Sequence, residues 1–186
     1  MRKSKCMNIE LKVAQLIMSR VCHDLAGGVG ALITGAEFLT EEEGGADDGA
    51  LDLITLSANQ TAARLQFFRI ALGFGAGQGG SEFITTEELH HLFENYIKGG
   101  RLNVVWNSEN IQIGLSEGRL LLNLCLIACE SLPRGGTVEV DIGYIENRLG
   151  FGLSARGENA RLLSEFQDTI CENVDMEKLS PRNVQG

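Results

Sequence analysis

An unbroken apolar repeat near the N-terminus limits the fold of this chain more than any other feature. Steps of four and three residues run through Ala14, Met18, Val21, Leu25, Gly28, Leu32, Gly35 and Leu39. This spacing places all eight residues on one stripe of an α-helix, and such a stripe is the packing seam of a helix in a bundle. The sequence therefore predicts a long helix over residues 9–41 that packs against other helices.

A histidine stands in the middle of this segment but off its seam. His23 lies two residues from Val21 and from Leu25, about 200° around a helix from each. We therefore expect its imidazole to face water. The residues within two turns of it are mostly small, and with one arginine they form a candidate partner-binding face: Ser19, Arg20, Ala26, Gly27 and Gly30.

The glycines beside this histidine need an explanation, because each glycine inside a helix costs about 1 kcal/mol relative to alanine. Three of them fall between positions 27 and 30. Small residues beside one exposed imidazole would let another protein approach closely. The alternative is that the glycines mark a helix break and that His23 is an ordinary surface histidine.

A second apolar repeat predicts a second helix over residues 50–73, after a polar, glycine-rich turn at 41–49. Two long helices joined by a short turn pack antiparallel and leave one broad face uncovered. Two copies of the chain would cover that face by forming a four-helix bundle across a two-fold axis. The alternative is that the rest of the chain covers it.

A glycine-rich run from Gly73 to Gly80 follows a helix, and no strand precedes it as in a phosphate-binding loop, which indicates a linker. We therefore expect two domains, a helical hairpin over residues 1–79 and an α/β domain over 80–186. In the second domain the pattern predicts, in order, a strand at Phe83-Ile84, a helix capped by Thr86 to about Ile97, strands at 102–106 and 111–115, a helix from Ser116-Glu117 to Leu132, a hairpin of strands at 138–145 and 150–155, and a last helix from Asn159 to about Cys171.

Composition excludes several classes of function. The net charge of −9 argues against a nucleic-acid or anionic-membrane partner, because both need a basic footprint. No run of 18 apolar residues is present, so we expect no membrane span. The five cysteines offer no recognised metal-ligand spacing, so we expect no metal or cofactor, and a cytoplasmic, reducing location.

Three motifs, in order along the chain, resemble the ChpT-type histidine phosphotransferases. They are His23-Asp24-Leu25, the stretch from Ala63 to Gly73 with Phe67-Phe68-Arg69 at its centre, and Leu132-Pro133-Arg134-Gly135-Gly136. The resemblance covers about residues 10–185. It implies an α+β fold, in which the hairpin forms a dimeric four-helix bundle followed by a degenerate ATP-binding α/β sandwich like that of histidine kinases.

The same resemblance implies the chemistry. His23 would take a phosphoryl group from the receiver domain of a hybrid histidine kinase and donate it to the receiver domain of a response regulator, as a homodimer. Asp24 would orient the imidazole ring or take its proton. The receiver would bring the Mg²⁺, so the chain itself needs no cofactor.

Two other functions remain open at this point, an ATP-dependent histidine kinase and a non-catalytic adaptor for a kinase or receiver. The kinase is disfavoured because Ile127 and Ala155 stand where kinases have a metal-binding asparagine and an adenine-reading aspartate. Asn123 is then most simply a structural residue of its helix. The chain departs from the family in two places: Gly28 replaces the usual proline of the histidine motif, and the C-terminus is expected to be shortened.

Overall fold

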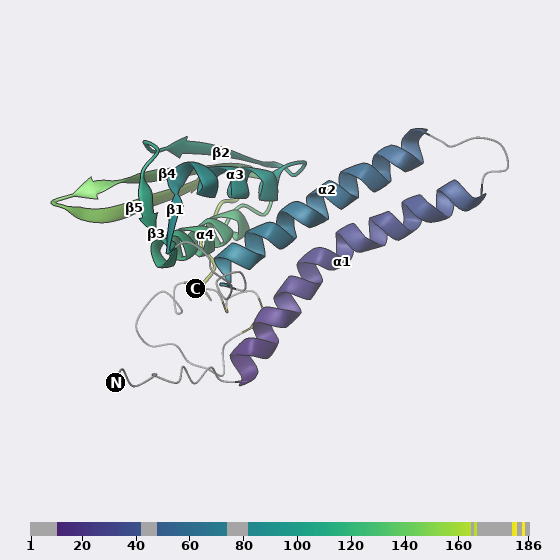
Figure 1. Cartoon of the computed structure of the whole chain (residues 1–186), viewed down its shortest axis with the longest axis horizontal. Coiled ribbons are helices and arrows are strands. Elements are labelled where there is room, and N and C mark those ends of the chain that lie inside the picture. Colours follow the sequence, from purple (N-terminus) through teal and green to yellow (C-terminus); the bar gives the residue numbers. More distant parts are fainter. Residues whose placement is uncertain are drawn as a thin grey trace.

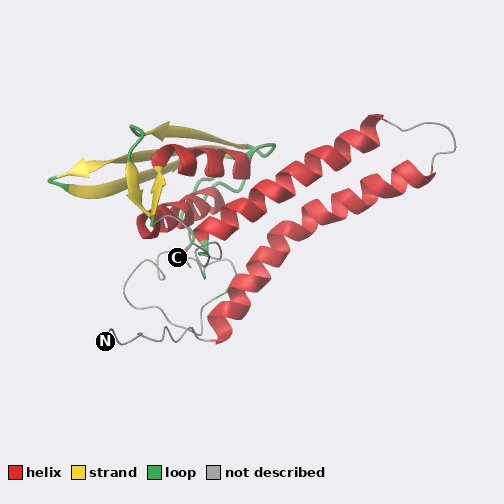
Figure 2. Cartoon of the chain, viewed as in Figure 1, coloured by secondary structure: helices red, strands yellow, loops and turns green. Residues whose placement is uncertain are grey.

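Two long antiparallel helices extend from a smaller unit of strands and short helices (Figures 1 and 2). The computed structural model describes residues 11–41, 48–73 and 82–164, together with residues 166, 180, 181 and 184. Within these residues the fold is α+β, as expected, and the elements follow one another in nearly the predicted order.

The long helices are α1 (Leu11–Glu41) and α2 (Asp48–Ala71), and both confirm the helices expected from the apolar repeats. The turn predicted between them and the glycine linker after α2 lie almost wholly outside the described residues.

Two glycines of the α1 seam lie against α2 and allow the helices to approach closely. A Cβ atom added to Gly28 would lie 2.1 Å from the Oγ1 atom of Thr61, and one added to Gly35 would lie 2.7 Å from Cγ1 of Ile54. Gly28 and Gly35 are therefore glycine because a larger residue at either position would collide with α2. Figure 1 shows that α1 changes direction about midway along its length.

The α/β unit, which follows the two long helices, contains two sheets. Strands β1 (Phe83–Thr85) and β3 (Gln112–Gly114) pair antiparallel. The larger sheet has the order β2-β4-β5, with β2 (Leu102–Asn107) parallel to β4 (Gly136–Ile145), and β4 antiparallel to β5 (Arg148–Arg156). The predicted hairpin of the last two strands is confirmed.

Helices α3 (Thr86–Ile97) and α4 (Leu115–Glu130) complete this unit. Helix α3 includes Thr86, which was predicted to be its cap, and α4 begins one residue before the predicted Ser116. The cap of α3 is Thr85, not Thr86: its hydroxyl accepts from the backbone of Glu88, whose carboxylate accepts from the backbone N–H of Thr85. Thr86 is instead buried and donates to the carbonyl of Glu109. The prediction missed this because the two threonines are adjacent and only the tertiary contact separates their roles.

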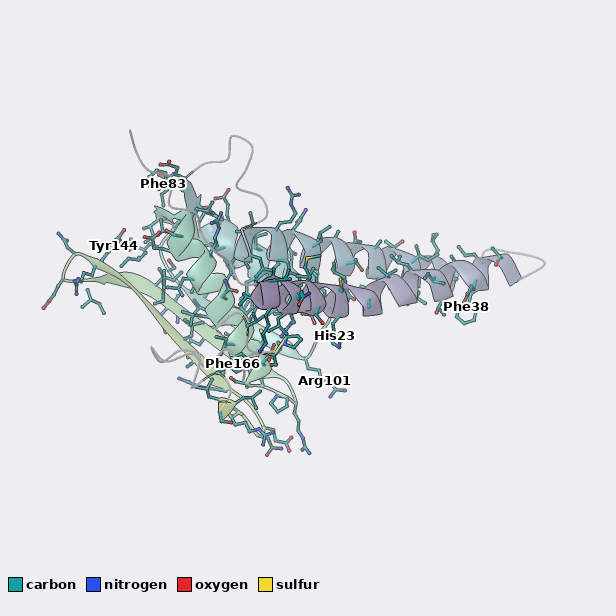
Figure 3. The ribbon with its side chains drawn as sticks, turned by 90° about the horizontal axis from the view of Figure 1, so that it is seen from below. His23, Phe38, Phe83, Arg101, Tyr144 and Phe166 are labelled. Atoms are coloured by element: carbon teal, nitrogen blue, oxygen red, sulfur yellow. The ribbon has the colours of Figure 1, made fainter. Side chains whose placement is uncertain are left out.

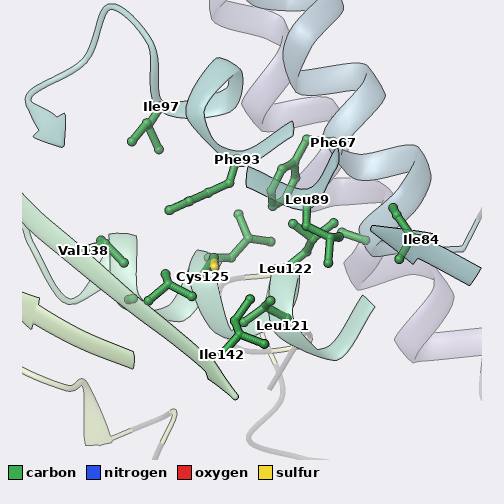
Figure 4. Close-up of a cluster of buried hydrophobic side chains, with 14 of the residues drawn as sticks. Phe67, Ile84, Leu89, Phe93, Ile97, Leu121, Leu122, Cys125, Val138 and Ile142 are labelled. Atoms are coloured by element: carbon green, nitrogen blue, oxygen red, sulfur yellow. The ribbon is translucent and has the colours of Figure 1, made fainter. Parts of the chain in front are cut away.

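The apolar core lies between the larger sheet, α3, α4 and the last turns of α2 (Figure 4). Leu121, Leu122 and Cys125 of α4 belong to this cluster together with Val138 and Ile142 of β4. Phe67 and Phe68 of α2 enter the same core, where the Phe67 ring stacks on Tyr96 of α3 at 4.4 Å. The hairpin is thus joined to the α/β unit by shared packing, across the predicted boundary at residues 79 and 80.

The last predicted helix does not begin where expected. Asn159 adopts a positive φ of 59° in a turn, and residues 160–163 have no regular structure. The backbone is helical at Ser164 and Phe166, and most of the residues beyond lie outside the described part of the chain. The positive φ of Asn159 does not fit a helix, and the first helical residue, Ser164, lies five residues after the predicted start.

The hairpin exposes apolar side chains along both helices, including Met18, Val29 and Ile33 of α1 and Leu51 and Leu65 of α2. By length and composition alone, α1 is also long and apolar enough to cross a membrane, which was not expected from the sequence. One such helix is weak evidence for a span, since the buried core helix of a soluble protein and an N-terminal signal sequence pass the same test. Arg20 and Asp24 interrupt this helix with paired charges.

Candidate functional site

His23 lies on the half of α1 nearest the α/β unit and projects away from α2, whereas Phe38 lies toward the far end of the hairpin (Figure 3). Its side chain is 86% exposed. The expectation that the imidazole faces water is confirmed, and the helix continues through it without a break. The alternative of a helix break at the glycines is therefore wrong.

Asp24 stands between this imidazole and the body of the protein. Its Oδ1 atom lies 3.1 Å from Nδ1 of His23. Its other oxygen, Oδ2, accepts a hydrogen bond of 2.8 Å from Nε of Arg20. One carboxylate thus contacts both a nearly free imidazole and a guanidinium that is largely buried.

Arg20 was predicted to be an exposed charge that binds a partner, but the structure shows it mostly covered. Its side chain is only 13% exposed, and its Nη1 atom also pairs with Glu130 at the end of α4. Burial alone would lower the pKa of Arg20, but the two carboxylates more than offset this and raise the pKa above its ordinary value. The pattern of exposed helix positions could not show this, because the partner that buries Arg20 is 110 residues away.

A second arginine contacts the backbone at the same point. Nη1 of Arg64, on α2, donates to the carbonyl oxygen of Asp24 at 2.9 Å. This carbonyl is the one whose helical partner would be the N–H of Gly28, four residues on. A proline at position 28, usual in the family, would leave that carbonyl without its helical donor. Arg64 therefore supplies a donor at the place where the family's helix is normally interrupted.

A cleft of about 750 Å³ opens beside His23, between α1 and the α/β unit. From α1 it is lined by Ser19, Arg20, His23 and Asp24. The opposite wall is formed by residues far along the chain: Glu130, Pro133, Arg161, Leu163, Ser180 and Pro181. Pro133 of the Leu132–Gly136 motif lies at this wall, and Gly135 and Gly136, both with positive φ, lead the chain from there into β4.

The remaining residues of the predicted partner face are open. Ala26, Gly27 and Gly30 are exposed, and a Cβ atom added to either glycine would meet nothing within 4 Å. The glycines around His23 thus divide into two classes, since Gly28 packs against α2 while its neighbours face outward. The sequence did not separate them.

Glu130 and Arg161 were not among the predicted site residues. Both are separated from His23 by more than a hundred residues, and no local spacing connects them to it. Arg64 is, with Arg20 and Arg69, a candidate from the sequence for contact with an acidic receiver surface, but its contact with the backbone of Asp24 was not predicted.

Two residues of α4 that were compared with histidine kinases, Ile127 and Asn123, serve packing and helix contacts. Ile127 is buried, and Nδ2 of Asn123 donates to the carbonyls of Ala71 and Arg119 at 3.0 and 2.8 Å. Asn123 therefore ties α4 to the end of α2, as a structural residue would. Among the described residues no group of three or more histidine, cysteine or acidic side chains could hold a metal ion.

Comparison with known proteins agrees with this architecture. Residues 86–186 match the family model of the histidine phosphotransferase C-terminal domain. Protein phosphotransferase ChpT of Brucella abortus (strain 2308) is 33% identical over 175 residues, which are 94% of this chain and 82% of that protein. A solved structure of a bacterial phosphotransferase superposes with a TM-score of 0.79 at 31% identity, covering 95% of this chain and 83% of the other.

A helical hairpin with an exposed histidine, joined to an α/β unit of this type, defines a protein histidine phosphotransferase. The chain belongs to the ChpT-type family of these phosphotransferases, which act in phosphorelays.

Proposed function

We propose that His23 is the residue through which this phosphotransferase relays phosphoryl groups between receiver domains. The single observation on which this rests is the geometry of the imidazole: it is exposed beside a cleft, and among the described residues a carboxylate approaches its Nδ1 atom alone. Nδ1 contacts Asp24, so Nε2 is the nitrogen left to react.

The proposed reaction has two steps. In the first, the Nε2 lone pair of neutral His23 attacks the phosphorus of an aspartyl phosphate on the donor receiver, the P–O bond to that aspartate breaks, and the carboxylate leaves. The imidazole now bears a positive charge, which the Asp24 carboxylate stabilises at Nδ1. In the second step an aspartate oxygen of the accepting receiver attacks the same phosphorus, the N–P bond breaks, and neutral His23 returns.

The donor is proposed to be the receiver domain of a hybrid histidine kinase, and the acceptor the receiver domain of a response regulator. Receivers would bring the Mg²⁺ that neutralises the transferring group, so the phosphotransferase supplies an imidazole and a docking face. The open positions Ala26, Gly27 and Gly30 support this, because a partner's backbone can approach His23 there without meeting side chains.

The α/β unit is proposed to dock the partner without binding ATP. Its wall of the cleft, with Pro133 and Arg161, stands directly across from His23 and is a surface a receiver can contact. Ile127 offers Mg²⁺ no oxygen ligand and is buried in packing. Ala155 has no carboxylate to recognise adenine.

The chain is further proposed to act as a homodimer through its hairpin, in the cytoplasm. Met18 belongs to the apolar repeat but is exposed, and helical geometry places the exposed Val29 and Ile33 on the same stripe of α1. Leu51 and Leu65 form a corresponding stripe on α2. Two such hairpins, packed as a four-helix bundle, would bury both stripes.

The deciding experiment incubates the protein with a receiver domain bearing labelled phosphate. We expect acid-labile, base-stable label on the unmodified chain and none on His23→Ala, which should keep its melting temperature because the side chain is exposed. His91→Ala is the matched control, since His91 is also exposed and also faces a carboxylate, that of Glu94. Label retained on His23→Ala would reject the proposal.

A further inference from the structure

We infer that Arg20 is a positioning residue for phosphotransfer, which holds Asp24 against His23 and at the same time fixes the nucleophile relative to α4 of the α/β unit. This inference rests on the proposed role of His23. It concerns a different link in the mechanism, namely how an imidazole on an exposed helix surface is kept in one orientation.

An exposed histidine has little to orient it. The side chain of His23 is 86% exposed, and within the described part of the chain its one contact of this kind is the 3.1 Å approach of Nδ1 to Asp24. In a free imidazole either nitrogen can hold the proton. A carboxylate beside Nδ1 favours the proton there and leaves the Nε2 lone pair free. The orientation of the imidazole therefore depends on how firmly the Asp24 carboxylate is held.

Arg20 is what holds this carboxylate. Asp24 is only 16% exposed, and its two oxygens are divided between His23 at Oδ1 and Arg20 at Oδ2. Arg20 lies one helical turn before Asp24, so its guanidinium reaches the carboxylate from the same face of α1. A bond to a charged, partly buried donor is stronger than a neutral one.

The guanidinium also connects two parts of the molecule. While Nε donates to Asp24, Nη1 donates to Glu130 at the last residue of α4. Beneath this network lies Tyr96 of α3, whose pKa is raised by burial and by the Asp24 carboxylate. Arg20 thus contacts both walls of the cleft, and the position of His23 is set relative to the surface across from it.

Two properties distinguish this arrangement from a surface ion pair. The side chains of Arg20, Asp24 and Glu130 are all less than one-fifth exposed, so water screens their attraction weakly. In contrast, the pair of Arg156 and Glu139 on the sheet has its guanidinium 77% exposed. Arg156→Ala is therefore a matched control that removes an arginine from an ion pair outside the site.

The first test measures the protonation of the His23 ring by nitrogen-15 NMR of the full-length protein. With three histidines in the chain, His23→Asn identifies the signal. We expect the unmodified protein to hold the proton on Nδ1, and Arg20→Ala to shift the population toward the Nε2 proton. Arg20→Lys, which can still donate to Asp24, should restore much of the original signature. A purely structural role for Arg20 predicts no change in this ratio for a variant that remains folded.

The second test measures the rate of phosphoryl transfer at saturating receiver for Arg20→Ala, Asp24→Asn and the double variant. We expect Arg20→Ala to slow transfer about tenfold to a hundredfold, as misplacement of a reacting group does. Because Arg20 orients His23 through Asp24, the double variant should lose less rate than the product of the two single effects. Effects that multiply, or an Arg20→Ala rate equal to that of the Arg156→Ala control, would overturn the inference.

If Arg20→Ala leaves Asp24 and Glu130 to repel each other and the protein does not fold, Arg20→Gln takes its place. Its amide donates one hydrogen bond without charge, and we expect a ring signature and a rate between those of the unmodified protein and Asp24→Asn. An Arg20→Gln protein equal to the unmodified one in both would overturn the inference. Label on His23→Ala would instead reject the proposed function, while the NMR measurement still reports whether Arg20 orients the ring.

Discussion

The hairpin and the α/β unit differ in how completely they bury their large apolar side chains. In the α/β unit, α3, α4 and the larger sheet enclose a core whose main side chains, such as Leu121, Phe93 and Val138, are fully buried. In the hairpin, α1 and α2 meet through glycine and short side chains, and large apolar residues such as Met18 and Leu65 remain exposed. The described part of the α/β unit encloses a core, to which the end of α2 contributes, whereas the hairpin leaves large apolar side chains exposed.

This difference fits the roles proposed for the two regions. The core of the α/β unit holds one wall of the cleft in place, and the exposed faces of the hairpin are the ones proposed to meet a second copy and a receiver. The join between them is the end of α2, where Phe67 and Phe68 belong to the core of the α/β unit. Predictions that remove or move these residues separate the two regions experimentally.

The largest effect is expected where the two regions share a core. Phe67 is fully buried and packs on Phe68, Phe93 and Tyr96. Phe67→Ala should lower the free energy of unfolding by about 3–5 kcal/mol, measured by denaturant titration, because it leaves a cavity. Phe38→Ala, at an exposed phenylalanine toward the far end of the hairpin, is the control and should change it by less than about 0.5 kcal/mol. Equal effects would contradict the contrast between the regions.

The next effect tests the surface that the hairpin leaves open. Leu65→Asp should weaken the proposed homodimer by about 2–4 kcal/mol, roughly 30- to 1,000-fold in Kd, because it buries an unpaired charge in the bundle. Light scattering across a concentration series would measure this change.

Leu56 provides the matched control for that experiment. It is similarly exposed on the same helix but nine residues away, and therefore on the opposite side, about 180° around. Leu56→Asp should leave the dimer intact. A monomeric unmodified protein at micromolar concentration, or equal effects of the two variants, would reject the bundle.

The smallest effect distinguishes two glycines of α1 that lie two residues apart. Gly28→Ala places a Cβ atom against Thr61 and should destabilise the protein by about 1–3 kcal/mol. Gly30→Ala meets open space and should stabilise the helix by up to about 1 kcal/mol. Thermal melting compares them directly, and a stabilising Gly28→Ala would show that the two helices do not approach as closely as described.

Much of the architecture was predictable from the sequence because it depends on local spacing. The two long helices follow from apolar repeats of three and four residues, and the β4–β5 hairpin follows from two strand patterns around a short turn. The same periodicity placed His23 off the seam and in water, since the direction of a side chain on a helix depends only on its position in the repeat.

What the sequence could not determine was which neighbours each of these residues meets. The order of strands β2-β4-β5 and the entry of Phe67 into the core depend on contacts between distant segments. Repeats alone could not show that Gly28 faces α2 and Gly30 faces solvent, because both are only small residues until the second helix is in place.

Arg20 shows this limit most directly. Its position one turn from His23 was visible in the sequence, and it suggested an open charge for a partner. Only the folded chain brings Glu130 to the other side of the guanidinium, and a carboxylate from 110 residues away turns a surface charge into a buried link. The helical repeat determined where His23 points, and the tertiary structure determined which side chains surround it, because electrostatic partners are set by proximity in space and not by spacing along the chain.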